Sequence, residues 1–323
     1  MFRQSDVNKL VTVFGGSGFI GRHVVRALAK RGYRIRVAVR RPELAGFLQP
    51  LGRVGQIHAV QANLRYSQSV EAAARDSDAV VNLVGLLYER GRQRFDTVHA
   101  RGAEKVALAA AAFGAPLVHG SAIGADPESP SLYARSKAMG EKLVLAAMPE
   151  AVIVRPSIVF GPEDSFFNRF ASMARFSPLL PLVGGGHTRF QPVFVGDVAA
   201  AIAAAVDGAA KPGTIYELGG PEIQSFRELM EYMLAVIERR RLLLPMPFPV
   251  ASAMASFLGL LPKPLLTTDQ VALLQRDNVV SGEARREGRT LKDLGIDPIA
   301  METVVPSYLW RYRKAGQFSR RPA

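Results

Sequence analysis

The sequence predicts an α/β protein with a Rossmann-type, doubly wound parallel sheet and a smaller, mostly helical C-terminal lobe. Two observations carry this prediction. Apolar runs alternate with amphipathic helical patterns from residue 10 to residue 155, and the runs are continuous, as in a parallel sheet covered by helices on both faces. A glycine-rich turn joins the first run to the first helical pattern at 11–22, where such folds carry a nucleotide-binding turn.

The expected elements alternate along the chain. Strands are expected at 10–14, 34–39, 56–61, 79–83, 116–119 and 151–155, and helices at 19–30, 67–75, 97–113 and 132–147. Beyond 155, proline and glycine interrupt the pattern until a helix at 197–206 and a strand at 214–218 return to the main sheet. The nucleotide domain is therefore expected at 1–160, completed by 195–219, and the smaller lobe at 161–194 and 220–323.

Each glycine of the first turn has a physical role. Gly15 lets the strand reverse, Gly18 lets the backbone approach a pyrophosphate, and Gly21 lets the helix pack closely on the sheet. The start of the helix then presents N–H groups and a positive dipole end to the phosphates. The turn predicts a dinucleotide site formed by Gly15, Gly16, Ser17, Gly18, Phe19, Ile20, Gly21 and Arg22.

The residues after the second strand favour NADP(H) over NAD(H). NAD-selective folds place an Asp or Glu about 20 residues beyond the glycine turn, to bind the ribose 2′-hydroxyl. This chain has Arg40 and Arg41 there and no carboxylate. Guanidinium groups bind a 2′-phosphate through charge-assisted hydrogen bonds, and Arg22 starts the helix beside the same place.

Tyr133 and Lys137 stand four residues apart at the start of a predicted helix, one turn above each other. In a nucleotide-binding α/β fold, a lysine ammonium near a phenol lowers the pKa of the phenol and hydrogen-bonds the nicotinamide ribose. The phenol then exchanges a proton with a carbonyl or alcohol. Tyr133 and Lys137 are therefore candidate catalytic residues, although cofactor binding alone also explains them.

Several segments together resemble the extended and atypical short-chain dehydrogenase/reductase superfamily: 15–21, 82–85, 133–137, 155–162 and 191–198. The segments 168–173, 175–178, 268–271 and 291–296 resemble one branch, the nucleotide-binding accessory subunits of respiratory complex I and their bacterial relatives. The resemblance implies tightly held NADPH, a place on the peripheral arm near the membrane, and no known turnover. It also implies cofactor contacts at Asn63, Leu64, Val84, Gly85, Ser121, Tyr133, Lys137, Pro156 and Ile158.

The chain departs from the catalytic pattern of that superfamily after the fifth strand. Ala122 stands where redox members carry a Ser or Thr, and Ser121 lies one place early, although a shift of register would make it the catalytic hydroxyl. Loss of this hydroxyl removes a donor to the developing oxyanion, worth about 3 kcal/mol. Two milder departures are Asn63, where the superfamily often has aspartate, and Phe194, where it often has histidine.

Two classes of function follow. The first is an NADP(H)-binding accessory or assembly subunit of a respiratory NADH:quinone oxidoreductase, with partners in that membrane complex and a peripheral place on the cytoplasmic face of the inner membrane. The alternative is an enzyme, either an NADPH-dependent reductase or an NAD(P)-dependent sugar-nucleotide epimerase/dehydratase. A regulator that senses NADP(H) is a third class. Tyr133 and Lys137 leave enzymatic activity open.

The charge distribution suggests a further partner. The net charge is +13, and residues 1–60 hold eleven Lys or Arg against two acidic residues. This surplus indicates an acidic protein partner, an anionic lipid surface or simply a solvated basic face. Nucleic acid is not expected, because no reading motif is present. The chain has no cysteine, which excludes disulfides, and its start has no apolar stretch typical of a signal peptide.

The segment 242–262 contains no charged residue, but prolines at 245, 247 and 249 break its first third. Only 250–261 is then expected as a continuous helix, too short to span a bilayer. This helix is expected either inside the lobe or with an apolar face against a membrane or partner.

The remaining polar residues suggest little chemistry. The five histidines fit no metal-ligand spacing, so no metal site is expected, and most are expected at the surface or at strand ends. Glu163 and Asp164 are expected in a solvated loop.

Overall fold

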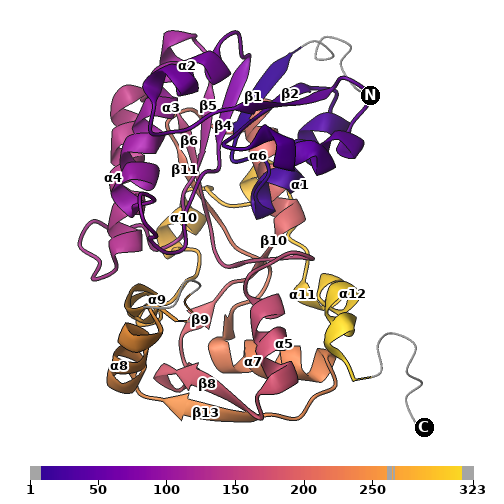
Figure 1. Cartoon of the computed structure of the whole chain (residues 1–323), viewed down its shortest axis with the longest axis vertical. Helices are drawn as coiled ribbons and strands as arrows, with labels where there is room; N and C mark the ends of the chain where they lie inside the picture. The colour runs from indigo at the N-terminus through magenta and orange to yellow at the C-terminus, as the bar shows by residue number, and fades with distance from the viewer. Residues whose placement is uncertain (1–8, 260–263, 265, 315–323) are drawn as a thin grey trace. The chain divides into compact units, whose positions relative to one another are not determined.

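The apolar runs of the N-terminal half form a seven-stranded parallel sheet in the computed structural model (Figure 1). Its order is β11-β6-β5-β4-β1-β2-β3. The chain starts at the centre with β1 and proceeds outward to β3, then crosses to β4 on the other side of β1. The carboxyl ends of β1 and β4 thus meet at a topological switch point, where such sheets bind ligands. The strands are β1 (Leu10–Phe14), β2 (Arg34–Val39), β3 (Ile57–Gln61), β4 (Ala79–Asn82), β5 (Leu117–Gly120), β6 (Val152–Pro156) and β11 (Ile215–Leu218).

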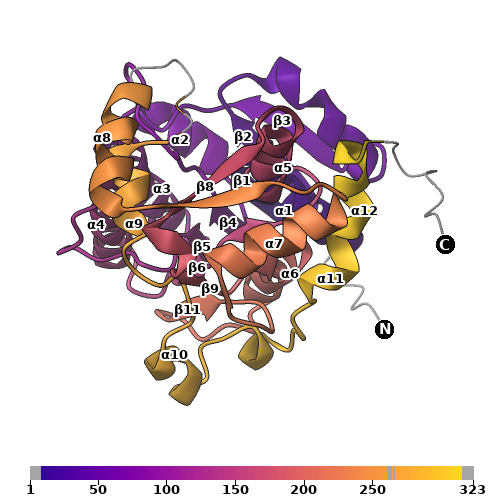
Figure 2. The same ribbon diagram turned by 90° about the horizontal axis from the view of Figure 1, so that it is seen from below.

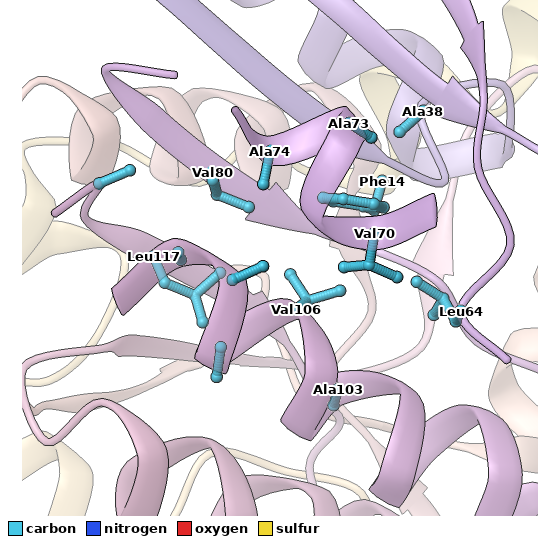
Figure 3. Close-up of a cluster of buried hydrophobic side chains, with 14 of the residues drawn as sticks. Phe14, Ala38, Leu64, Val70, Ala73, Ala74, Val80, Ala103, Val106 and Leu117 are labelled. Carbon is cyan, nitrogen blue, oxygen red and sulfur yellow. The ribbon is translucent and has the colours of Figure 1, made fainter. Parts of the chain in front are cut away.

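Helices cover both faces of this sheet (Figure 1). One face carries α1 (Phe19–Lys30) and α6 (Val195–Val206), and the other carries α2 (Ser67–Ala74), α3 (Arg101–Ala112) and α4 (Leu132–Ala147). Figure 3 shows the core on the second face, where Phe14, Val80 and Leu117 of the sheet meet Val70 of α2 and Val106 of α3. This packing confirms the predicted doubly wound fold.

The predicted elements agree closely with the observed ones. β1, β2, α1 and α4 have the predicted bounds, and the other strands of the sheet and α2 differ by at most one residue at either end. The predicted helix 97–113 is instead a π-helical turn, η2 (Asp96–Ala100), followed by α3. A 3₁₀ segment that was not predicted, η1 (Pro42–Leu51), follows β2.

The structure describes residues 9–259, 264 and 266–314, and the chain forms two compact units. The first contains Met1–Pro156, Gly196–Leu218 and Ser281–Asp297, and the second contains Ser157–Val195, Gly219–Val280 and Pro298–Ala323. The segment Ser281–Asp297, which is expected from the sequence in the smaller lobe, lies in the first unit. There Arg289 donates to Ile215 O at 2.7 Å, and Glu217 N donates to Arg289 O at 2.9 Å, so the segment covers edge strand β11.

The second unit packs short helices and small two-stranded sheets around a phenylalanine-rich core. Its strands are β7 (Val159–Phe160), β8 (Leu179–Val183), β9 (Arg189–Phe190), β10 (Val193–Phe194), β12 (Gln224–Ser225) and β13 (Leu242–Met246). Its helices are α5 (Phe167–Phe176), η3 (Gly184–Gly186), α7 (Phe226–Val236), α8 (Phe248–Leu258), α9 (Thr268–Leu273), α11 (Met301–Val304), α12 (Pro306–Leu309) and η5 (Trp310–Tyr312), while α10 (Gly282–Arg286) and η4 (Lys292–Leu294) belong to the first unit.

The uncharged segment 242–262 forms two elements. Its first part is β13, which pairs in parallel with β8, and Figure 2 shows the two strands side by side. The helix predicted at 250–261 is α8, which starts at Phe248 because proline is well tolerated in the first turn of a helix. Its last predicted residues, 260 and 261, lie outside the described residues. α8 is not a buried helix: Ala251 and Ala255 are buried, while Val250 and Phe257 are exposed.

Glu163 and Asp164 lie in a loop as expected, and Glu163 is exposed, but the expectation that Asp164 is solvated is wrong. The Asp164 carboxylate is buried and accepts hydrogen bonds from the backbone of Gly161, Phe166 and Asn168. It also accepts from the hydroxyl of Tyr308 at 2.6 Å, which ties α12 to the start of α5. Burial raises the pKa of Asp164, and these hydrogen bonds oppose the increase. Asp164 is therefore a structural residue of the second unit.

Candidate functional site

The glycine turn after β1 has the geometry of a phosphate-binding loop. Gly15 has a φ of +78°, which only glycine adopts readily, and a Cβ on it would lie 3.0 Å from the carbonyl carbon of Leu83 after β4. A Cβ on Gly21 would overlap the carbonyl oxygen of Gly15, so α1 packs directly on the turn. The first helical bond of α1 runs from Arg22 N to Gly18 O, which leaves the preceding N–H groups without helical acceptors. The turn thus fits a dinucleotide pyrophosphate.

The predicted arginines lie near the start of α1 and after β2. Arg22 is fixed in place, because its guanidinium lies 4.9 Å from the ring centroid of Phe47 and donates at 3.4 Å to the carbonyls of Ser17 and Gly18. Arg40 and Arg41 are both exposed, and their side chains make no hydrogen bond or ion pair with another described residue. Their guanidinium groups are thus available to an anionic ligand.

The loops after β3 and β4 hold the next predicted contacts. The side chain of Asn63 stabilises the loop after β3, because its oxygen accepts a hydrogen bond from Arg65 N at 3.2 Å. The side chain of Leu64 lies in the core rather than at a ligand surface. After β4, Val84 N donates to the side-chain oxygen of Asn82 at 3.2 Å, and Gly85 is exposed. The backbone of Val84 and Gly85 therefore lies just beyond the carboxyl end of β4, at the topological switch point of the sheet.

The start of α4 presents the predicted tyrosine and lysine. Ser131 caps the helix by accepting from Ala134 N at 3.2 Å. Lys137 is buried and donates from Nζ to Gly120 O at 3.1 Å, and its ammonium lies 6.0 Å from the ring centroid of Tyr133. Burial lowers the pKa of Lys137 to about 8, against the opposing effect of Glu141. The lysine is therefore held close to the tyrosine and is close to losing its proton near neutral pH.

The hydroxyl of Ser121 is an unsatisfied polar group at this end of the sheet. Its Oγ is buried without a hydrogen-bond partner among the described residues, while Ser121 N donates to Val154 O and extends the β5–β6 ladder. A buried hydroxyl costs free energy unless a ligand or water satisfies it. Ala122 has no hydroxyl. The unsatisfied hydroxyl of Ser121 therefore supports the alternative in which Ser121, one residue early, takes the place of the serine or threonine that redox members of the superfamily carry.

Sequence reasoning missed two buried histidines, His99 and His119. Asn82 donates from its amide nitrogen to Nδ1 of His119 at 3.2 Å, since its oxygen is bonded to Val84 N, so the His119 proton is assigned to Nε2. Nε2 is buried without a partner among the described residues. Burial and the charge of Lys137 lower the pKa of His119 to about 3. His119 lies near the end of β5, as expected for most of the histidines, whereas His99 is neither at the surface nor at a strand end and is buried by partners from distant parts of the sequence.

The predicted site residues do not all lie in one unit. Pro156 ends β6 in the first unit, with the glycine turn, Asn63 and α4. Ile158 lies in the second unit, where its backbone N–H donates to the side chain of Asn278 at 3.0 Å. No group of His, Asp and Glu among the described residues has the arrangement of a metal site.

The buried lysine gives stability a distinctive pH dependence. With a folded pKa of about 8 against an ordinary value of 10.5, Lys137 releases its proton in the folded chain before the unfolded chain does. Folding of the nucleotide-free protein should therefore become more favourable as pH rises between these values, by about 3 kcal/mol in total. Urea unfolding of wild type and Lys137→Met at pH 7.5 and 10.5 measures this: the wild type should gain relative to the variant, and a constant difference would contradict the assignment.

The fold and this arrangement define a dinucleotide-binding protein of the short-chain dehydrogenase/reductase type. The chain belongs to the NAD dependent epimerase/dehydratase family, whose model matches residues 11–219. The matched region contains the glycine turn and the Tyr133–Lys137 pair.

Several curated proteins are similar over most of the chain. The mitochondrial NADH dehydrogenase (ubiquinone) 1 alpha subcomplex subunit 9 of Arabidopsis thaliana is 37% identical over 97% of this chain and 80% of its own length. The mitochondrial 40 kDa subunit of NADH-ubiquinone oxidoreductase of Neurospora crassa is 32% identical over 99% and 84%. A ceramide reductase of Caulobacter vibrioides is 36% identical over 62% of each chain.

Solved structures agree with the fold. An NADPH-dependent quinone oxidoreductase of Escherichia coli matches with a TM-score of 0.73 at 20% identity, over 93% of this chain and 99% of that one. A dTDP-glucose 4,6-dehydratase of Streptomyces venezuelae matches with a TM-score of 0.71 at 20% identity, over 94% and 96%.

Proposed function

We propose that this chain is an NADP(H)-binding accessory subunit of a respiratory NADH:quinone oxidoreductase that holds its nucleotide with little or no turnover. The observation that carries the proposal is the similarity along nearly the whole chain to complex I subunits, at 37% identity in the plant relative. The glycine turn and the start of α1 would hold the pyrophosphate, with Arg40 and Arg41 at the 2′-phosphate. Lys137 would hold the nicotinamide ribose. Bound NADPH is a hydride donor.

Purification of the tagged chain from detergent-solubilised membranes tests this proposal. The chain should co-migrate on native gels with NADH:quinone oxidoreductase activity, and about one NADPH per chain should be extracted from it. Tyr133→Phe should leave both results unchanged, because the phenol is not needed for a nucleotide that is only held. Rapid carbonyl-dependent oxidation of the NADPH that Tyr133→Phe abolishes, or absence of the chain from the complex, would overturn the proposal.

A second candidate is an NADPH-dependent reductase. The buried, unsatisfied Ser121 hydroxyl favours it, because it directly follows Gly120, whose carbonyl accepts from Lys137, and a hydroxyl near that lysine is suited to binding a substrate carbonyl. The similarity to a ceramide reductase agrees with this chemistry. Ser121→Ala separates the candidates: it should greatly slow a reductase, but hardly change a protein that only holds its nucleotide.

We also propose that the second unit contacts an anionic membrane surface. No helix in the described part of the chain is both long and apolar enough to cross a bilayer. Leu179, Leu242 and Leu244 form what we call the β8–β13 face, where Leu242 pairs with Leu179 and all three side chains are exposed, Leu242 by 71%. Phe176, which ends α5 three residues before Leu179, is exposed by 83%. Leu180 and Leu182 alternate with this face and are fully buried.

Arginines border the β8–β13 face. The guanidinium of Arg175 lies 5.5 Å from the ring centroid of Phe176. Burial, followed by the charges of Arg241 and Arg175, lowers the pKa of Arg239, so these cations lie close together. Like charges gathered beside exposed apolar side chains are typical of surfaces that bind acidic headgroups and insert shallowly. This contact would place the chain peripherally on the cytoplasmic face of the inner membrane.

Vesicle sedimentation tests the lipid contact. The wild type should sediment with vesicles of phosphatidylcholine and phosphatidylglycerol and much less with phosphatidylcholine alone. Leu242→Ser with Leu244→Ser should weaken anionic-vesicle binding roughly tenfold, because two leucines lose their apolar contact. The control is Leu44→Ser with Leu132→Ser, two comparably exposed leucines of the first unit. Equal loss in both double variants, or no wild-type binding, would refute the contact.

A further inference from the structure

His99 lies in the π-helical turn before α3, and its side chain is 2% exposed. π turns are frequent at functional sites, since the extra residue redirects side chains. A Cβ on Gly140 would overlap the carbonyl oxygen of His99, so α4 packs directly on this turn. The turn is thus in contact with the helix that carries Tyr133 and Lys137.

The ring nitrogens of His99 connect two segments of the site. Leu86 N donates to Nε2 at 2.8 Å, so Nε2 is the unprotonated nitrogen and Nδ1 carries the hydrogen. Nδ1 then donates to Ser136 Oγ at 2.9 Å, and the Ser136 hydroxyl donates to Tyr133 O at 2.8 Å. The hydrogen bonds therefore run in one direction, from the loop after β4 to the first turn of α4.

The His99 ring also contacts the tyrosine ring directly. It stacks on Phe95 with centroids 5.3 Å apart, and it meets Tyr133 edge to face at 5.4 Å and 89°. Burial, with the nearby charges of Lys137 and His119, lowers the pKa of His99 to about 2. The ring is therefore neutral at physiological pH, and its single proton stays on the nitrogen that faces Ser136.

We propose that His99 is a positioning residue that holds the loop after β4 and the Tyr133 end of α4 in one fixed arrangement. The loop carries Val84 and Gly85, and a Cβ on Gly85 would lie 3.6 Å from both His99 Nε2 and Lys137 Nζ. The part of the inference that concerns nucleotide retention rests on the proposed function. The part that concerns Tyr133 holds with or without a nucleotide.

Three variants separate the two connections. An asparagine at position 99 places an amide nitrogen near the position of Nδ1 but does not reach Leu86. His99→Asn should therefore keep the hydrogen bond to Ser136 and lose the hydrogen bond from Leu86 N in the loop after β4. A glutamine extends to the position of Nε2, so His99→Gln should keep the hydrogen bond from Leu86 N and lose the hydrogen bond to Ser136. Ser136→Ala should have the same effect as His99→Gln while retaining the ring. Val106→Ala, in the buried face of α3, is the control for general loosening.

Two measurements report on the two connections: the rate of NADPH dissociation, and the titration midpoint of the Tyr133 phenol from ¹³Cζ-tyrosine NMR, assigned with Tyr133→Phe. His99→Asn should release NADPH about fivefold faster, the value of one hydrogen bond, and should shift the phenol midpoint less than His99→Gln does, because it keeps the link to Ser136. His99→Gln and Ser136→Ala should retain NADPH but shift the phenol midpoint, because the first turn of α4 loses its link to His99 and the phenol moves relative to Lys137 and its other neighbours.

The outcomes are decisive in both directions. If the Asn and Gln variants behave alike, or if Val106→Ala reproduces either effect, His99 is an ordinary core residue and the inference fails. If the wild type retains no NADPH, the proposed function fails. The phenol midpoints of nucleotide-free His99→Gln and Ser136→Ala then still decide whether His99 positions Tyr133.

Discussion

Replacing Arg40 and Arg41 together with alanine should weaken NADPH binding roughly 30-fold to roughly 700-fold, because two charge-assisted hydrogen bonds to the 2′-phosphate are worth about 2–4 kcal/mol in total. Both side chains are exposed and without partners among the described residues, so their removal should not disturb the fold. NADH has no 2′-phosphate, and its affinity should fall less than about threefold. Fluorescence titration of both nucleotides against wild type and variant measures the difference.

Arg34→Ala is the matched control for this experiment. Arg34 is an exposed arginine at the opposite end of β2: it begins the strand and pairs with Leu10, whereas Arg40 follows the carboxyl end of the strand. It should change neither affinity appreciably. An equal loss for NADPH and NADH in the double variant would show that the arginines act elsewhere on the nucleotide. If Arg34→Ala weakened NADPH binding as much as the double variant does, the effect would come from the net charge of the protein and not from contacts with the 2′-phosphate.

The sequence predicts the first unit well because its signals are local. The apolar run and glycine turn at 10–21 and the capped helix at 132–147 contain within themselves the periodicity and the caps that end them. The strand Leu242–Met246 escapes such reasoning, because its prolines suggest a broken helix and its partner β8 lies about 60 residues earlier. The π turn escapes as well, since its pattern is that of the helix it extends.

The residues of the candidate site also fall into two groups: those that the local sequence predicts and those that depend on partners distant in the sequence. The glycine turn, Arg22 and the Tyr133–Lys137 pair are predicted as site residues from their spacing in the sequence. Burial of His99 and Asp164 is not predicted, because it depends on Ser136 and Tyr308, which lie 37 and 144 residues away. Whether these residues contact a nucleotide stays a prediction that the variants above test.

The second large effect concerns the ion pair that fastens α4 to the sheet. Arg155 on β6 donates from Nε and Nη2 to the Glu141 carboxylate at 2.8 and 2.5 Å, and its Nη1 lies 3.6 Å from Glu217. The Glu141 side chain is 6% exposed and that of Arg155 is 21% exposed. Burial would lower the pKa of Arg155, but Glu141 and Glu217 outweigh it and raise the pKa. The guanidinium is therefore charged and needs its partners.

Glu141→Gln should lower the free energy of unfolding by about 2–4 kcal/mol, because it leaves a largely buried arginine with only the weaker Glu217 contact. The double variant Glu141→Leu with Arg155→Met should cost less than the single change, since no buried charge is left unpaired. Urea unfolding measures both. Glu283→Gln is the control: it breaks the pair that the exposed Glu283 makes with Arg289 at 3.2 Å, and it should cost less than about 1 kcal/mol because Arg289 keeps its ion pair with Glu287 at 2.7 Å.

The same change links stability to the site. Glu141 lies one turn after Lys137 on α4, and its charge raises the lysine pKa against burial. Glu141→Gln should therefore move the Lys137 titration below about 8 and loosen the helix that positions Tyr133. NADPH should then dissociate faster, and more so above pH 7, where Lys137 loses its proton. A variant that is destabilised but shows wild-type release at every pH would mean that α4 keeps its place without the ion pair, and that nucleotide retention does not depend on the Lys137 charge.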